Sequence, residues 1–250
     1  MFELKVPYLP QAKIESAANE LLRKYGKWKG IEIKPPIDID EIIEGYFGLR
    51  LTFCNLEEIL GMDDVLGAMA DIVAEGKVRA FGLSNESAWG TCRWIDRAEA
   101  TGGPRVASVQ NEYSLLCRLY DTDMAEVGVN EDVTLLAFSP LGAGLLTGKY
   151  QNGALPEGSR MAINGDLGGR KSDRVFAAVD AYLGVARRHG LDPVHMAMAW
   201  QTTRPFPNCP IFGATTSAQL ETILGGIGVT LSDEVLADIA RVHKTHPMPY

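Results

Sequence analysis

The sequence predicts an α/β fold built on parallel strands, and three features support that prediction. Four short apolar, often β-branched segments alternate with segments whose apolar residues recur at helical spacing. Glycine and proline residues punctuate the boundaries between them. Of the 250 residues, 46% are hydrophobic and 22% are charged, as in a globular protein with a sizeable core. Strands that alternate with helices pair in parallel through right-handed crossovers.

The N-terminal quarter is predicted to be mainly helical. Apolar residues of Ile14–Tyr25 recur at intervals of three and four, which indicates a helix with one apolar face that ends at Gly26. After two consecutive prolines, a second short helix capped near Asp38 is expected to run to about Tyr46. Alternating apolar and polar residues then predict a half-buried strand at Leu49–Phe53.

From Asp64 onward the predicted elements alternate regularly. The pattern fits either half of a TIM-type barrel or a small doubly wound sheet, and both place functional loops at the carboxyl ends of the strands. The expected strands are Val78–Leu83, Val106–Gln110, Val133–Ala137 and Cys209–Phe212. The expected helices are Val65–Ala74, Ser87–Glu99, Thr122–Val129, Asp173–His189, Pro193–Thr202, Ser217–Leu224 and Asp233–His243, with a long glycine-rich loop from Pro140 to Ser172.

The charge and the cysteines argue against several classes of function. A net charge of −8 argues against a nucleic-acid or membrane-surface partner, since either would need clustered Lys and Arg. No apolar signal segment opens the chain and no long apolar run follows, so a cytoplasmic protein is expected. The cysteines are widely spaced, which favours reduced thiols over disulfides or a metal site: Cys54, Cys92, Cys117 and Cys209.

Polar residues follow the first two strands. Ser84-Asn85 offers a hydroxyl and an amide, and an amide suits a carboxamide ligand because it both donates and accepts; capping of the next helix is the alternative. Gln110 adds a second amide. Tyr113 either faces a pocket or packs beneath the loop, and Arg118 could pair with a carboxylate such as Glu112.

The last two strands are followed by residues suited to a flat ring and to phosphate. Phe138 could stack on a heterocycle, and the glycine-rich segment after it exposes backbone N–H groups beside Lys149. The glycines could equally serve an ordinary turn. Hydroxyl residues at 215–217 stand where a helix begins, which favours an anion, although a helix cap without a ligand would look the same.

The order of these segments resembles that of the aldo-keto reductases, most closely the Tas-like branch, over about Ala68–His246. The segments that carry the resemblance are GKVRAFGLSN, QNEYSLL, LLAFSPLGAGLLTGKY and PIFGATTSAQLETIL, in that order. The resemblance implies that residues 67–250 form a partial TIM-type (β/α) barrel, made of the last four βα units. It also implies the family reaction, reduction of aldehydes or ketones by NADPH.

The resemblance further implies a binding site for NADP(H). Two positions near the adenine depart from the family pattern, at Thr222 and Ile223, and Ile223 cannot hydrogen-bond a base, so we expect weak binding. The implied contacts are Ser84, Asn85 and Gln110 for the nicotinamide carboxamide, Phe138 for its ring, Ser139, Leu141, Gly144 and Lys149 around the diphosphate, and Gly213, Thr215 and Gln219 around the 2′-phosphate.

The residues that carry out catalysis in the family have no match here. The family uses a Tyr acid with Lys, Asp and His on early barrel strands, and no such set precedes Val78 in this chain. We therefore assign no catalytic residue and expect impaired catalysis. The alternatives are a non-catalytic nucleotide-binding or interaction module, and a non-functional gene fusion.

Residues 1–66 resemble the N-terminal helical part of ImmA/IrrE-type metallopeptidases. The segments involved are KVPYLPQAKIESAANELLRKYG and PPIDIDEIIEGYFGLRLTF. The HExxH zinc motif of that family is absent, so no metal site is expected. A half barrel would also leave two strand edges open, and we expect a homo-oligomer to form through them.

Overall fold

Four parallel strands form one sheet in this computed structural model, which describes residues 11–30 and 61–250. Each neighbouring pair is parallel, and the order of the strands in the sheet is their order in the sequence. The predicted α/β class with parallel strands is therefore confirmed. The strands are β1 (Phe81–Ser84), β2 (Val106–Glu112), β3 (Thr134–Phe138) and β4 (Asn208–Ile211).

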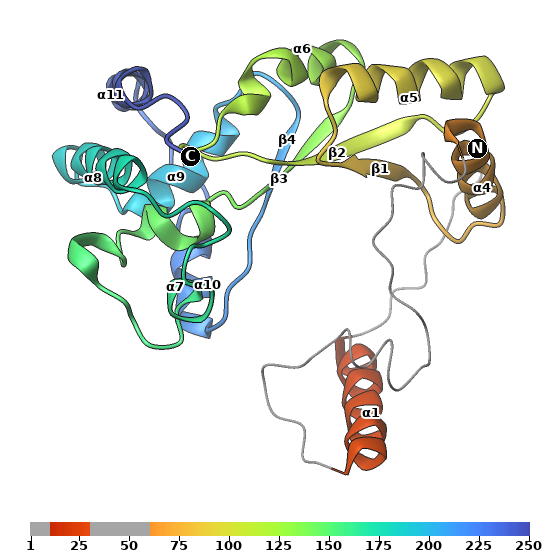
Figure 1. Ribbon diagram of the computed structural model, residues 1–250, viewed down its shortest axis with the longest axis horizontal. Coiled ribbons are helices and arrows are strands. Elements are labelled where there is room, and N and C mark those ends of the chain that lie inside the picture. Colours follow the sequence, from red (N-terminus) through yellow and green to blue (C-terminus); the bar gives the residue numbers. More distant parts are fainter. Residues whose placement is uncertain (1–10, 31–60) are drawn as a thin grey trace.

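Helices follow each strand, as the alternating pattern predicts. In Figure 1, α5 and α6 lie together on one side of the sheet, while α8, α9 and α11 are grouped beyond its other end. Within the described residues, no helix is long and apolar enough to cross a membrane. The helices after residue 60 are α4 (Met62–Ala74), α5 (Ala88–Thr101), α6 (Asp123–Asn130), α7 (Arg160–Ile163), α8 (Asp173–Arg188), α9 (Pro193–Thr202), α10 (Ser217–Leu224) and α11 (Asp233–Thr245).

Helix α1 (Gln11–Lys29) is longer than predicted. The sequence suggested a stop at Gly26, but the helix continues for three more residues. Helices often end at a glycine with a left-handed backbone, and here that glycine is Gly30, with φ of 74°. The Gly30 N–H donates to the Gly26 carbonyl at 2.8 Å. The predicted helix ending near Tyr46 and the strand Leu49–Phe53 lie outside the described residues.

Strand β1 begins three residues later than predicted, at Phe81 instead of Val78. The residues before it close the end of α4 instead of joining the sheet. The backbone N–H groups of Lys77 and Val78 both donate to the Ile72 carbonyl, at 3.1 and 3.5 Å. This cap satisfies a carbonyl that the helix end would otherwise leave free.

The two sides of the sheet have different surroundings. Helix α5 packs on β2 and α9 packs on β4, and the strand side chains on that side are buried: Val109 and Leu135 are 0% exposed. The other side, which we call the open face, carries half-buried and exposed side chains. Strand alternation and the register place on it Gly82, Ser84, Ser108, Gln110, Glu112, Thr134, Leu136, Phe138, Cys209 and Ile211.

An aromatic cluster anchors the chain that follows β2. Tyr113 is 0% exposed and stacks on Trp200, with ring centroids 5.2 Å apart. Its hydroxyl donates a short hydrogen bond to Asp121, which also pairs with Arg118 and Arg204. Burial, then this hydrogen bond, raises the pKa of Tyr113 well above its ordinary value. Tyr113 therefore packs beneath the loop. Arg118 pairs with a carboxylate, as the sequence suggested, but the partner is Asp121; Glu112 binds Arg170 instead.

Candidate functional site

The loop after β1 places two predicted side chains at the carboxyl edge of the sheet. Asn85 adopts a left-handed backbone with φ of 54°, and its N–H donates to the Gln110 carbonyl at 2.9 Å. Its side-chain amide donates to the Ser84 hydroxyl at 3.3 Å. Because Ser84 and Gln110 are register partners on the open face, all three polar side chains converge at one place. They remain exposed, so they are accessible to a ligand.

Asn111 fixes this loop against β2, a role that the sequence did not suggest. Its amide nitrogen donates to the Glu86 carbonyl at 2.9 Å, and its amide oxygen accepts from the Glu86 N–H at 3.1 Å. These two hydrogen bonds fix the loop after β1 to the carboxyl end of β2. Helix α5 is capped one residue later by Ser87, whose hydroxyl accepts from the Gly90 N–H at 3.0 Å. Ser84 and Asn85 are therefore not the cap.

The loop after β3 combines an aromatic ring with an unusual backbone. Phe138 is half-buried, and register places its side chain on the open face. Ser139 then has φ of 54°, and residues 142–144 also have positive φ. The Gly142 N–H donates to Ser139 O at 2.8 Å, and the Gly144 N–H donates to Leu141 O at 3.0 Å. These two N–H groups, expected to face phosphate, are instead used within the turn.

Lys149 supplies the positive charge of this loop. Its ammonium nitrogen lies 5.1 Å from the centroid of the Tyr150 ring. A Cβ added to Gly144, where φ is 91°, would meet the Cε of Lys149 at 3.0 Å and its Nζ at 3.1 Å, so the lysine lies directly over the glycine. Among the described carboxylates, none comes within 4.0 Å of the Lys149 ammonium. Within the part of the chain that the structure describes, the Lys149 charge is therefore not neutralised by a carboxylate.

The segment after β4 is organised as a helix start. Thr216 caps α10 by accepting from the Gln219 N–H at 3.2 Å. The side-chain amide oxygen of Gln219 accepts from the backbone N–H and the hydroxyl of Thr215, at 2.9 and 3.0 Å. Gly213 is exposed, with open space where a side chain would lie. Thr215 and Gln219 are therefore brought together, but they already satisfy each other in part.

Thr222 and Ile223 are the two positions that depart from the family pattern. The Ile223 side chain faces away from solvent, and the Thr222 hydroxyl is turned toward its own helix. Ile223 is 6% exposed and packs inward. The Thr222 hydroxyl donates to Ala218 O at 2.9 Å. Neither side chain offers a free polar group beside Thr215 and Gln219.

A second polar cluster joins the C-terminus to the carboxyl end of β2. Arg170 binds Glu112 through two parallel bonds, Nε to Oε1 at 2.8 Å and Nη2 to Oε2 at 2.6 Å. The Tyr250 hydroxyl donates to the same carboxylate at 2.7 Å, and the guanidinium carbon lies 5.5 Å from the Tyr250 ring centroid. Burial, then the Glu112 charge, raises the pKa of Tyr250 well above its ordinary value. Sequence reasoning missed this cluster because its members are far apart in the chain.

The other tyrosine hydroxyls after residue 60 are hydrogen-bonded or buried. The Tyr150 hydroxyl accepts from the Met161 N–H at 3.3 Å. The hydroxyls of Tyr120 and Tyr182 are buried without a partner, and burial raises the pKa of Tyr120 to about 12. Within the described part of the chain, no tyrosine hydroxyl therefore stands free at the open face. That part also contains no group of three or more His, Cys, Asp or Glu that could hold a metal ion.

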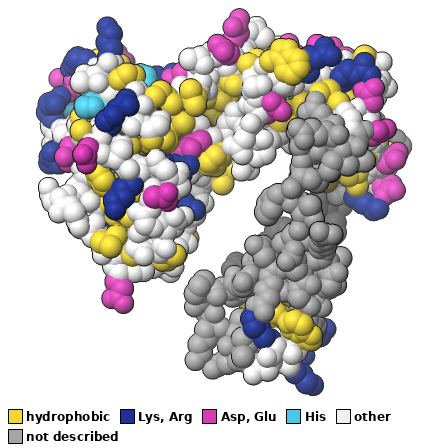
Figure 2. All heavy atoms as spheres, viewed as in Figure 1, with side chains coloured by type: hydrophobic (Ala, Val, Ile, Leu, Met, Phe, Trp, Pro, Cys, Tyr) yellow, Lys and Arg dark blue, Asp and Glu magenta, His cyan; other side chains and the backbone are white. Residues whose placement is uncertain are grey.

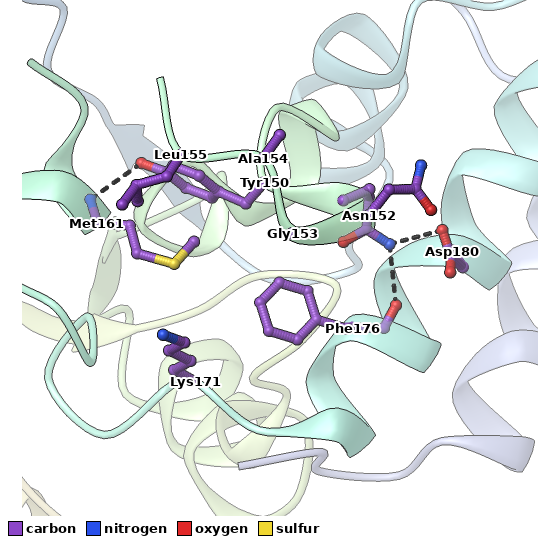
Figure 3. A pocket seen from close by; sticks show the side chains of 10 residues that line it. Tyr150, Asn152, Gly153, Ala154, Leu155, Met161, Lys171, Phe176 and Asp180 are labelled. Carbon is purple, nitrogen blue, oxygen red and sulfur yellow. Dashed lines mark hydrogen bonds between the residues drawn. The ribbon is translucent and has the colours of Figure 1, made fainter. Parts of the chain in front are cut away.

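A cleft of about 320 Å³ lies beside the loop that follows Lys149. Figure 3 shows that Lys171 points toward Met161. The side-chain amide of Gln151 donates to Asp180 at 2.6 Å and to the Phe176 carbonyl at 3.1 Å. None of the predicted cofactor-binding residues lines it.

In Figure 2, acidic and basic side chains are interspersed over the visible face.

The sequence profile of the aldo/keto reductase family matches residues 14–244. This chain belongs to the aldo/keto reductase family. The matched range begins well before residue 66, and nothing in the comparisons supports a resemblance of the N-terminal segment to ImmA/IrrE-type metallopeptidases.

Curated relatives within the aldo/keto reductases include Protein tas from Escherichia coli (strain K12). It is 43% identical over 186 residues, which cover 74% of this chain and 54% of the relative. An aldo-keto reductase from Babesia bovis is 32% identical over 171 residues, covering 66% of this chain and 60% of that protein. The chain therefore spans somewhat more than half the length of these relatives.

A solved structure agrees with the fold. A glycerol dehydrogenase from Gluconobacter oxydans superposes with a TM-score of 0.60 at 22% identity, covering 75% of this chain and 55% of that structure. At this identity the likeness concerns the fold alone. The described sheet and its helices form a partial TIM-type barrel, as the sequence predicted.

Proposed function

We propose that this aldo/keto reductase chain binds NADP(H) at the carboxyl edge of its sheet. The observation that carries the proposal is the convergence of all four strand-end segments on that edge, beside a Lys149 ammonium that has no carboxylate partner among residues 11–30 and 61–250. Folds with parallel strands bind their ligands beyond the carboxyl ends of those strands, which supports the same location.

Each segment would hold one part of the cofactor. Ser84, Asn85 and Gln110 would bind the carboxamide, and Phe138 would stack on the nicotinamide ring. Because the turn already uses two of its N–H groups, the diphosphate would depend chiefly on Lys149. The neighbouring contacts are assigned to Ser139, Leu141 and Gly144, and those of the 2′-phosphate to Gly213, Thr215 and Gln219.

Binding at the adenosine end is proposed to be weak. Thr215 and Gln219 hydrogen-bond to each other, and a ligand would have to compete with those bonds. The inward packing of Ile223 leaves no polar contact for the adenine at that position. New hydrogen bonds from the ligand would replace the existing bonds between Thr215 and Gln219, so they would add little to the net free energy of binding.

Catalysis by this chain alone is proposed to be slow or absent. NADPH supplies a hydride, and the carbonyl oxygen that receives the negative charge then needs a positioned proton donor. The described phenols are buried or engaged, and Tyr250 donates to Glu112. A general acid typically contributes a factor of about 10²–10⁴ in rate, so its loss would leave only residual reduction.

Calorimetric titration with NADPH tests the binding proposal. We expect binding that Lys149→Met weakens by roughly 10- to 150-fold, because a charge-assisted contact contributes roughly 1.5–3 kcal/mol. Lys171→Met is the matched control, because that lysine lines the separate cleft. Absence of binding, or equal weakening by both variants, would refute the assignment. Reduction of a reactive aldehyde at ordinary enzymatic rates would refute the proposed impairment.

We further propose that residues 1–66 form a unit separate from residues 67–250. About a quarter of the chain lies outside its alignment with Protein tas, which is compatible with such a boundary. Limited proteolysis should cut before residue 67 and leave a stable C-terminal fragment. Cleavage only within that fragment would contradict the division.

A further inference from the structure

The sheet has two unpaired edges and one side that is only partly covered in the described part of the chain. β1 pairs only with β2, and β4 pairs only with β3. On the open face Ile211 is 40% exposed, and Leu136 and Phe138 are half-buried. Parallel sheets are normally covered on both faces, and an unpaired edge invites pairing with another chain. Both features indicate a surface for another polypeptide.

We propose that a second copy of this chain supplies the covering surface, so that two copies close one barrel. β4 of each copy would pair in parallel with β1 of its partner. A two-fold axis along the barrel keeps all strands running in the same direction, so closure joins two four-stranded sheets. About eight strands is the number at which side chains alone fill the interior of a barrel.

The backbone groups at the two edges are complementary. Leu135 N–H donates to Pro207 O, so Asn208 and Pro210 direct their backbone groups away from β3. Pro210 has no N–H, so this edge offers the N–H of Asn208 and the carbonyl groups of Asn208 and Pro210. On β1 the Asn85 N–H donates to Gln110 O, which leaves both the N–H and the carbonyl groups of Gly82 and Ser84 facing outward.

The side chains next to those edges also fit one another. Ile211 on β4 needs cover, while Gly82 and Ser84 on β1 are small and leave room beside them. A single strand from another protein could pair with only one edge and would leave the other open. A second copy presents both edges in the required direction, which is why it is the occupant proposed.

Sedimentation of the full chain at micromolar concentration tests this proposal without reference to NADPH. We expect twice the monomer mass of 27.2 kDa. Ile211→Asp should give monomers, because it places a charge in the closed interior. Ile227→Asp should remain dimeric, because Ile227 is 78% exposed and lies outside the open face. Circular dichroism checks that both variants fold.

Alkylation of Cys209 provides an independent readout. This thiol is exposed on the open face of a single copy and would be enclosed on closure. Its reaction should be at least about tenfold slower in the wild-type dimer than in Ile211→Asp, a ratio that corresponds to about 1.4 kcal/mol. Cys209→Arg should also give monomers. A monomeric wild type, open-ended larger assemblies, or a dimer unaffected by Ile211→Asp and Cys209→Arg would each overturn the proposal.

Discussion

Replacement of Gly144 by alanine tests whether the position of Lys149 controls cofactor binding. Gly144 has φ of 91°, and forcing an L-residue into a left-handed conformation costs about 1–2 kcal/mol. For a folded unit of this size, that loss should lower Tm by roughly 2–8 °C. The new methyl group would also press on the Lys149 ammonium, which lies 3.1 Å from the position of the added Cβ. NADPH binding should therefore weaken, by up to about tenfold.

Gly153→Ala is the matched control for this experiment. Gly153 has φ of 75°, so the backbone cost is similar, but nothing lies within 4 Å of the added Cβ. Thermal unfolding should show similar losses for both variants, whereas calorimetry should show weaker NADPH binding only for Gly144→Ala. Equal binding by the two variants would refute the reasoning about Lys149.

Three other substitutions or measurements test the packing described above. Asp121→Ala should lower the free energy of unfolding in urea by about 3 kcal/mol, because it leaves the Tyr113 hydroxyl and two arginines unpaired, whereas Tyr113→Phe should cost only about 1 kcal/mol. Equal losses would contradict that account. Burial raises the pKa of Cys117 to about 11, so this thiol should stay protonated and resist alkylation in the native state up to about pH 10; rapid labelling at pH 8 would show that it is accessible. Tyr250→Phe removes the hydrogen bond to Glu112 and should speed amide exchange at residues 246–250, while the Arg170–Glu112 pair persists; unchanged exchange would show that this bond does not hold the chain end.

The order of strands and helices could be predicted because it depends on local patterns. Apolar runs, caps such as Ser87 and Ser172, and glycine punctuation determine those elements within a few residues of the chain. The start of β1 was misplaced because Val78 has strand character, yet its backbone closes the end of α4. A hydrogen bond at a helix end overrides the strand propensity of Val78, and the apolar pattern alone does not show it.

The candidate site was only partly predictable. The sequence located Asn85, Gln110 and Lys149 by their position after strands. It could not reveal that Gly144 N–H is used within its own turn, since that depends on loop geometry. Nor could it reveal the Arg170–Glu112 pair, because its partners are 58 residues apart and several charged residues could have taken either role.

Hydrogen–deuterium exchange with and without saturating NADPH is the most direct test of a cofactor site at the carboxyl edge. The account predicts slower exchange in residues 84–86, 110–113, 138–149 and 213–219, and little change in residues 150–180. Slower exchange centred on the cleft of Tyr150, Met161 and Phe176, or no change in any of the four strand-end segments, would contradict it.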